Sequence, residues 1–297
     1  MNKDLQISGF SDEISSNFDR QLEVVSNLGM RYISLRGIDG KNIGDFTTRE
    51  IKESVLKRLQ KYNVDVSSIG SPIGKVFITD EEGFSKQKEM LERLCQISRV
   101  LNCRYIRIFS FYIPKDEDPG KYKDEVIRRL REFVAIAEKY DVILLHENEK
   151  DIYGDISKRC NELLKAISSP YFKAIFDFAN FVQCGEDTQV CYDLLEDEII
   201  YIHIKDAVST DSQNVVCGTG DGKIPEILKQ AIKNGYKGFL TLEPHLVLFD
   251  SLKDLELEDA NEVIKDNKGL DGAGGYKLQY DSLIQILENI ESVENLI

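Results

Sequence analysis

The chain has no uninterrupted apolar run that approaches the roughly 20 residues of a bilayer span. Its first residues, MNKDLQISGFSDEI, are polar where a signal peptide needs an apolar core. Its six cysteines form no CxxC pair and lie inside patterned segments, so we expect reduced thiols that pack as small hydrophobes. We therefore predict a cytoplasmic protein that is neither exported nor embedded in a membrane.

The sequence also has fewer positively charged residues than negatively charged ones. The sequence has 38 Lys and Arg residues against 52 Asp and Glu residues, which gives a formal net charge of −14. A protein of this charge repels a phosphate backbone and has no basic patch for non-specific nucleic-acid binding. We therefore expect no nucleic-acid partner.

What the chain does have is a regular alternation of short and long apolar patterns. Short, β-branched runs predict eight strands, at Leu5–Ser8, Tyr32–Leu35, Val64–Ile69, Tyr105–Phe109, Val142–Leu145, Lys173–Phe176, Ile199–Ile204 and Phe239–Leu242. Between them, apolar residues three and four positions apart predict helices, around Phe18–Leu28, Ile51–Leu59, Met90–Leu101, Tyr122–Tyr140, Ile156–Ile167, Val190–Glu196, Ile224–Asn234 and Leu278–Ile290. Strand and helix thus alternate eight times.

Strict alternation demands a parallel sheet, because each return to the same edge needs a helical crossover. Eight units close a (β/α)₈ barrel, so we predict a single-domain α/β TIM barrel over residues 1–297. An open doubly wound sheet is the alternative. It is disfavoured because SGFSDEI, rather than the nucleotide-binding GxGxxG, follows the first strand.

One long irregular stretch, Pro244–Tyr276, separates the last predicted strand from the last helix. In a barrel this stretch would lie over the active-site mouth. We interpret its end, Gly272–Gly275, as a flexible joint. A lid, a plain insertion and a dimer contact are all consistent with its composition.

Polar residues follow four late strands at the end where barrels place their chemistry. They are Glu147 in HENE, Asp177 in FDFAN, His203 in YIHIKD and Glu243 in LTLEP. Alternation along each strand points these four side chains toward the barrel axis. Three carboxylates that close together would repel, and a divalent cation would neutralise them. Three oxygens and one imidazole suit Mn²⁺ or Mg²⁺ and tolerate Co²⁺ or Zn²⁺.

Several residues near these four can be interpreted as either functional or structural. His146 should point outward and be structural, whereas Glu149 returns to the inner face at the rim and rivals Glu147. Arg36, Arg107 and Lys205 are inward or rim groups that could bind substrate hydroxyls, a carboxylate or a phosphate. For Arg107, a structural role as a buried partner of a carboxylate is an equally good interpretation. The glycine run 218–222 either grips phosphate or forms a tight turn, and we favour the turn.

Five motifs resemble the sugar phosphate isomerase/epimerase superfamily. They are HEN at 146–148, FDFAN at 176–180, IHIKD at 202–206, CGTGDGKIP at 217–225 and NGYKGFLTLEP at 234–244, and the likeness covers nearly the whole chain. This superfamily of xylose-isomerase-like barrels includes ketose 3-epimerases, hydroxypyruvate isomerases and inosose dehydratases. The resemblance implies that Glu147, Asp177, His203 and Glu243 hold one divalent metal ion.

The resemblance also implies a chemistry. The metal acidifies the C–H beside a carbonyl, one of Glu147 and Glu243 removes the proton to give an enediolate, and the other reprotonates it. The substrate would be a small sugar or sugar derivative. We expect Asn180, Lys205, Arg107 and Glu149 to bind it. Relatives often form dimers or tetramers, which makes a homo-oligomer an expectation of the same kind.

Three departures weigh against a simple ketose 3-epimerase. Asn180 stands where many epimerases have histidine, Ser209 where they often have arginine, and Ser34 where relatives often have glutamate. A dehydratase of a cyclic keto-polyol is the second candidate, and a non-catalytic metabolite-binding barrel is the third. The superfamily's nucleases, whose zinc cluster uses many histidines, are disfavoured because the chain has only three.

Overall fold

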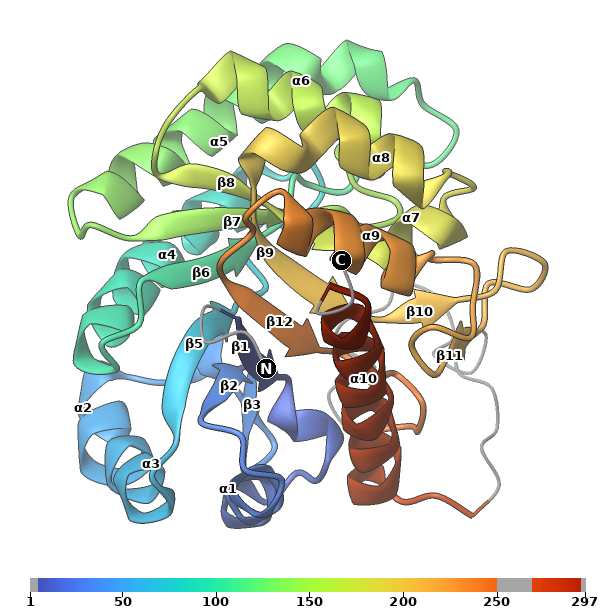
Figure 1. Cartoon of the computed structure of the whole chain (residues 1–297). Helices are drawn as coiled ribbons and strands as arrows, with labels where there is room; N and C mark the ends of the chain where they lie inside the picture. The colour runs from blue at the N-terminus through green and yellow to red at the C-terminus, as the bar shows by residue number, and fades with distance from the viewer. Residues whose placement is uncertain (1–4, 250–268, 295–297) are drawn as a thin grey trace.

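The computed structural model describes residues 5–249 and 269–294 and shows the predicted barrel (Figure 1). Eight parallel strands are hydrogen-bonded in the order β1-β12-β9-β8-β7-β6-β5-β2. Their bounds are Gln6–Gly9 (β1), Tyr32–Leu35 (β2), Asp65–Gly70 (β5), Tyr105–Ile108 (β6), Ile143–Glu147 (β7), Phe172–Asp177 (β8), Ile199–Ile204 (β9) and Phe239–Leu242 (β12). A parallel bridge between Phe10 and Ser34 brings the first and last strands of this order together. The prediction of a TIM barrel is confirmed.

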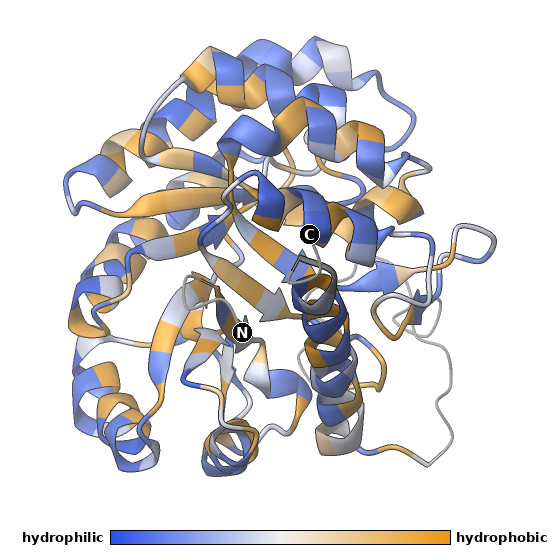
Figure 2. Ribbon diagram, in the orientation of Figure 1, coloured by the Kyte–Doolittle hydropathy of each residue, from blue (hydrophilic) through white to orange (hydrophobic). Residues whose placement is uncertain are grey.

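Helices cover the outside of the barrel. The predicted ones are present as α1 (Phe18–Asn27), α2 and α3 (Thr48–Glu50 and Leu56–Tyr62), α4 (Glu81–Val100), α5 (Lys123–Glu138), α6 (Ser157–Ile167), α8 (Thr188–Leu195), α9 (Ile224–Lys233) and α10 (Gly272–Glu294). Figure 2 shows apolar residues along the strands and on the helix sides that face them. Burial of these two surfaces against each other supplies the main core.

Some short elements were not predicted. A π-helical turn, η3 (Ile51–Val55), joins α2 to α3, and a short helix, α7 (Phe178–Gln183), follows β8 directly. Three 3₁₀ turns, η1 (Ser11–Glu13), η2 (Ile43–Asp45) and η4 (Pro119–Tyr122), lie in loops, and η5 (Glu196–Glu198) precedes β9. Two small antiparallel pairs, β3–β4 (Gly37–Ile38, Lys41–Asn42) and β10–β11 (Asp206–Ala207, Asn214–Val215), follow β2 and β9. These elements are too short for periodicity to reveal.

The barrel interior is layered. Leu145, Ile175 and Tyr201 form a buried apolar cluster, each two residues before a predicted site residue on the same strand. The Tyr201 hydroxyl lies 2.9 Å from the hydroxyls of both Ser67 and Ser68 on β5. Because side chains two apart share a face, this layer is the floor beneath the polar residues at the strand ends.

The interpretation of Gly272–Gly275 as a flexible joint is wrong, because these residues form the first turn of α10. A Cβ on Gly272 would lie 2.4 Å from the carbonyl oxygen of Glu13 and 2.5 Å from that of Ile14. Glycine is therefore required by close packing of α10 against the turn that follows β1. Within the stretch Pro244–Tyr276, residues 250–268 lie outside the described residues, so a lid there stays a prediction.

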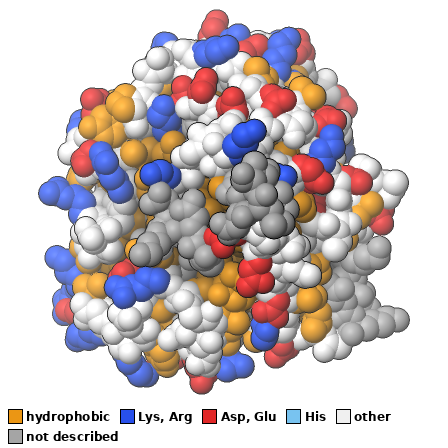
Figure 3. All heavy atoms as spheres, in the orientation of Figure 1, with side chains coloured by type: hydrophobic (Ala, Val, Ile, Leu, Met, Phe, Trp, Pro, Cys, Tyr) orange, Lys and Arg blue, Asp and Glu red, His pale blue; other side chains and the backbone are white. Residues whose placement is uncertain are grey.

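Two expectations concern the molecule as a whole. Among residues 5–249 and 269–294, no helix is both long and apolar enough to cross a membrane. On the face shown in Figure 3, Lys and Arg side chains are interspersed with Asp and Glu. The domain bounds 1–297 stay a prediction at both ends of the chain.

Candidate active site

The strand order places the four predicted metal-binding residues on neighbouring strands. Glu147 ends β7, Asp177 ends β8, His203 lies in β9 and Glu243 directly follows β12. His203 is the register partner of Asp177 on one side and of Thr241 on the other. All four are buried, and their potential ligand atoms lie within 4.8 Å of one another. The predicted convergence is thus observed.

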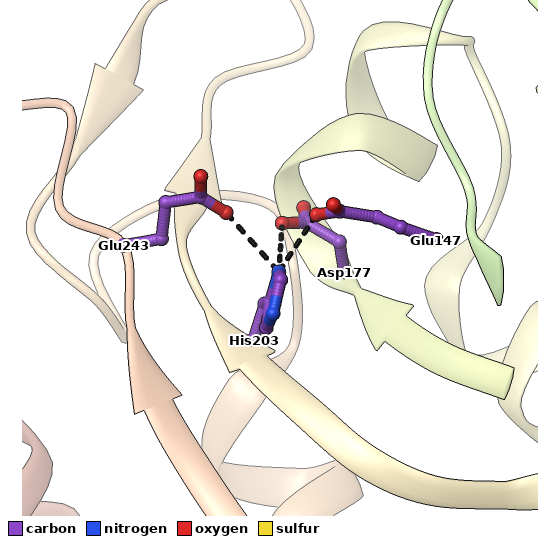
Figure 4. Close-up of side chains that lie close together, drawn as sticks. All are labelled: Glu147, Asp177, His203 and Glu243. Atoms are coloured by element: carbon purple, nitrogen blue, oxygen red, sulfur yellow. Dashed lines mark hydrogen bonds and ion pairs between the residues drawn. The ribbon is translucent and has the colours of Figure 1, made fainter. Parts of the chain in front are cut away.

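The three carboxylates meet at one ring nitrogen. His203 Nδ1 lies 2.7 Å from Glu147 Oε1, 3.1 Å from Glu243 Oε2 and 3.7 Å from Asp177 Oδ2. Figure 4 shows Glu243 reaching this nitrogen from one side and Glu147 with Asp177 from the other. The two glutamates therefore flank the centre of the cluster.

Each carboxylate also has its own cation. Arg36 Nη1 donates to Glu243 Oε1 at 2.9 Å, and Arg107 Nη1 lies 3.2 Å from Glu147 Oε2. Lys205 Nζ lies 3.3 Å from Asp177 Oδ2. Each glutamate thus gives one oxygen to an arginine and turns the other toward His203.

These contacts shift the pKa values of the site in different directions. Burial alone would raise the pKa of Glu147, but His203 and Arg107 outweigh it and lower that pKa. Burial is likewise outweighed at Glu243, where Lys205 and His203 hold the pKa well below its usual range. The pKa of Asp177 is raised because its burial outweighs Lys205. Both glutamates are therefore favoured as carboxylates at neutral pH.

The charge around the cluster fits a divalent cation. Five buried carboxyl groups (Asp12, Glu13, Glu147, Asp177, Glu243) face three buried cations (Arg36, Arg107, Lys205) and His203, whose pKa is raised well above its usual value because its burial is outweighed by the neighbouring carboxylates. Buried charge without a counter-ion is costly. Glu147 Oε2, Asp177 Oδ2 and Glu243 Oε2 also lack hydrogen-bond partners among the described residues. A divalent ion would replace the His203 proton as the counter-charge of Glu147, Asp177 and Glu243 and would give these oxygens a partner. An oxygen-rich donor set with one imidazole suits such an ion.

A pair of asparagines orients Asp177. Asn148 Oδ1 accepts from the Asp177 backbone N–H at 3.0 Å, and its Nδ2 donates to the Asp177 carbonyl oxygen at 3.0 Å. Asn180 Nδ2 in turn donates to the Asn148 carbonyl oxygen at 2.8 Å. Asp177 Oδ1 caps α7 by accepting from the Asn180 N–H, which leaves Oδ2 for the cluster. These contacts explain the asparagines of HEN and FDFAN. A substrate contact for Asn180 stays a prediction.

The fold distinguishes the roles of His146 and Glu149, the two neighbours of Glu147 in the sequence. Glu149 lies outside the cluster and pairs with Lys75, a residue of the loop after β5, at 3.2 Å. His146 is buried away from the cluster, against Phe172 and Gly154. Burial lowers the pKa of His146 to about 4, which keeps its ring neutral. Glu147 is therefore the glutamate of the cluster, and His146 is structural.

Three residues of the site were missed by the sequence reasoning. Asp12 and Glu13 follow β1 and both contact Arg36, and Glu13 accepts from the backbone N–H of His245 at 2.8 Å. Glu13, Glu243 and His245 form a second group with potential ligand atoms within 4.8 Å. Applying the strand-end rule to the first strand would have found Asp12 and Glu13 in SGFSDEI. Arg36 contacts both Glu13 and Glu243 in this second group, and burial raises the pKa of Glu13 to about 8.

The glycine run 218–222 forms a tight turn, as favoured. Asp206 Oδ2 accepts from the N–H groups of Gly218 and Gly220 at 2.9 and 3.0 Å. Its Oδ1 accepts from Gly222 at 2.9 Å and from Ala207 at 3.0 Å. The donors that could have gripped a phosphate are thus occupied by a carboxylate of the chain itself.

Comparison with known proteins agrees with this structure. A family model described as a xylose isomerase-like TIM barrel matches residues 22–288. Fructoselysine 3-epimerase of Escherichia coli O157:H7 is 22% identical over 172 residues, which cover 57% of this chain and 62% of that protein, less than two thirds of its length.

Two solved structures share the fold over nearly the whole chain. A D-tagatose 3-epimerase-like protein has a TM-score of 0.74 at 17% identity, over 97% of this chain and 98% of the other. The IOLI protein, solved with a zinc atom, has a TM-score of 0.73 at 15% identity, over 96% and 99%. Identities this low show the fold alone. With the family model matching most of its length, the chain belongs to the xylose isomerase-like TIM barrel family.

Proposed function

We propose that this protein is a divalent-metal-dependent isomerase or epimerase of a small sugar or sugar acid. The observation that carries the proposal is the placement of Glu147 and Glu243 on either side of His203, each with one oxygen turned inward. Glu147, Asp177, His203 and Glu243 would hold the cation, Mn²⁺ or Mg²⁺ by their donor atoms. The names of the relatives, two of which are 3-epimerases or like one, support the same class.

The bound cation would polarise the substrate carbonyl and stabilise the charge of an enediolate. Glu147 or Glu243 would accept the proton from the adjacent carbon, and their lowered pKa values keep both in the carboxylate form that can accept it. Epimerisation then needs the opposite glutamate to deliver a proton to the other face. Isomerisation needs a proton to be returned to the neighbouring carbon. A pair of carboxylates on both sides of the centre permits either outcome.

Four further residues would bind the substrate in this proposal. Lys205 and Arg107 are buried cations beside the cluster, where they can contact hydroxyl or anionic groups. Glu149 with its Lys75 partner lies outside the cluster but close to it in sequence. Asn180 lies beside the cluster, where its Nδ2 donates to the Asn148 carbonyl oxygen and its backbone N–H donates to Asp177 Oδ1.

The test is deuterium incorporation. Protein loaded with Mn²⁺ is incubated in D₂O with ketoses, hydroxypyruvate and inosose, and the mass of each compound is followed. Gain of deuterium at a carbon next to the carbonyl, lost in Glu243→Gln protein, is the expected result.

Two other outcomes would overturn the proposal in different ways. Loss of water from a cyclic keto-polyol would assign the dehydratase. No change in any compound, with metal and ligand binding intact, would favour the non-catalytic binding barrel. A matched control is Glu198→Gln, which removes a surface carboxylate that pairs with Lys173 at the opposite ends of β8 and β9 from Asp177 and His203.

A further inference from the structure

Of the two buried arginines that contact the cluster, Arg107 is the one with hydrogen-bond donors that have no partner among the described residues. Its Nη1 lies 3.2 Å from Glu147 Oε2 and 3.6 Å from Glu243 Oε1. Its Nε and Nη2 have no hydrogen-bond partner, although the side chain is only 3% exposed. The rings of Phe10 and Phe109 each lie 4.9 Å from the guanidinium carbon and help to hold its plane. Unpaired buried donors are costly, and such groups in a site are ready to bind a ligand.

Arg36, in the same site, shows which group binds the edge of a guanidinium that is formed by Nε and Nη2. In Arg36, Nε donates to Asp12 Oδ2 at 2.8 Å and Nη2 donates to Asp12 Oδ1 at 3.0 Å. The Nε–Nη2 edge of a guanidinium matches the spacing of two carboxylate oxygens, which makes a planar bidentate pair. Arg36 has filled this edge with a carboxylate of the protein, whereas Arg107 has not.

The position of Arg107 limits where the ligand carboxylate would lie on the substrate. Its Nη1 contacts both flanking glutamates, so the free edge lies next to the pair of carboxylates that would move the proton. A carboxylate bound there would lie next to the carbonyl group rather than at the far end of a long sugar.

Phosphate is disfavoured as the anion. Barrels commonly bind phosphate in the loops after the seventh and eighth strands. Here the N–H groups of the loop after β9, the seventh barrel strand in the chain, are occupied by Asp206. A guanidinium edge can pair with either a carboxylate or a phosphate, so the occupied N–H groups of this loop are what disfavours phosphate.

We propose that the substrate is an unphosphorylated keto acid of the sugar series, whose carboxylate is bound by Nε and Nη2 of Arg107. This inference rests on the proposed function and names its substrate class.

The test uses pairs of compounds that differ only at the first carbon. Hydroxypyruvate is compared with dihydroxyacetone, and 2-keto-D-gluconate with D-fructose, because each pair exchanges a carboxylate for a hydroxymethyl group. Calorimetry with Mn²⁺-loaded wild-type protein should show the keto acid binding at least about 10-fold more tightly. Arg107→Lys keeps the positive charge but loses the two parallel N–H donors of the guanidinium. It should reduce the preference for the keto acid over its hydroxymethyl analogue to the part that the metal alone provides.

The matched control is Arg104→Lys, three residues earlier and on the surface, where it pairs with Asp141. It should keep the full preference. If Arg107→Lys protein does not fold or hold Mn²⁺, the arginine Nε–H resonance in wild-type protein is the second measurement. Addition of hydroxypyruvate should shift that of Arg107, and addition of dihydroxyacetone should not.

The results separate this inference from the proposed function. Equal binding of both members of a pair, binding of neither, or an unshifted Arg107 resonance would overturn the keto acid. Deuterium uptake into a ketose would still support the isomerase in those cases. Tight keto acid binding through Arg107 without any deuterium uptake would instead count against the isomerase and leave the anion site standing.

Discussion

Arg36 and Glu243 form a buried ion pair across the barrel mouth, in which Nη1 donates to Oε1 at 2.9 Å. The guanidinium is itself fixed by Asp12, which accepts two hydrogen bonds from it at 2.8 and 3.0 Å. Glu243 Oε1 is thereby occupied, and Oε2 faces His203 Nδ1 at 3.1 Å. Arg36 thus determines which oxygen of Glu243 is presented to the centre, as outer partners of metal ligands do.

Replacing Arg36 with lysine should lower turnover by about 10- to 100-fold with a smaller change in KM. Lysine keeps the positive charge but cannot hold Asp12 and Glu243 in one plane. Steady-state kinetics and Mn²⁺ calorimetry measure the two effects separately. Arg31→Lys, at an exposed pair with Asp65 just before β2, is the matched control. Unchanged kcat in Arg36→Lys protein would show that Glu243 needs no such support.

Glu243→Gln should abolish turnover more completely than it reduces metal binding. The amide keeps one oxygen donor but cannot accept a proton, so we expect a loss of at least about 100- to 10,000-fold in kcat. Mn²⁺ affinity from calorimetry and the deuterium assay give the comparison. Full activity in this variant would contradict the mechanism with two glutamates.

His203→Ala should weaken Mn²⁺ binding strongly, because the nitrogen on which three carboxylates converge is lost. His146→Ala provides the contrast, since His146 packs against Phe172 outside the cluster. The first variant should lose metal affinity, and the second should lose mainly thermal stability. Equal metal affinity in His203→Ala and wild-type protein would exclude His203 as a ligand.

Asn148→Ala should lower metal affinity by about 10- to 100-fold although Asn148 is outside the four-residue cluster. Its side chain holds both the N–H and the carbonyl of Asp177, so its loss frees the orientation of that carboxylate. Calorimetry with Mn²⁺ measures the effect. Asn234→Ala, which removes an exposed hydrogen bond to Glu196, should leave the affinity as it is.

Asp206→Ala should destabilise the fold by at least about 2 kcal/mol, because four backbone N–H groups lose a charged acceptor. Urea unfolding gives the free energy of unfolding. Asp221→Ala removes an exposed carboxylate of the same glycine run, which accepts only from Ser209, and should cost much less. A similar loss in both variants would mean that the carboxylate of Asp206 has no special part in holding the turn.

Periodicity explains how much of the fold was predictable. All eight barrel strands overlap their predicted ranges, because each buried parallel strand is a short β-branched run between amphipathic helices. The error at Gly272–Gly275 has the opposite cause. Glycine is required there by close contact with the backbone of Glu13 and Ile14, which lie at the other end of the chain.

The candidate site was predictable to the same degree. Strand alternation alone directs Glu147, Asp177, His203 and Glu243 to one axis, because each lies two residues beyond a core-facing position on its own strand. The choice between Glu147 and Glu149 needed the structure, since both lie on the inner face by alternation and Glu149 pairs instead with Lys75, from a distant loop.

The sequence by itself thus determined the barrel, its strand order along the chain and the four residues at its centre, because these follow from local patterns that repeat. Only the tertiary structure decided which cation accompanies each carboxylate. Arg36 and Glu243 are 207 residues apart, and no local pattern links them. Closure of the barrel places β1 between β2, which precedes Arg36, and β12, which precedes Glu243, and this arrangement lets the two buried charges pair.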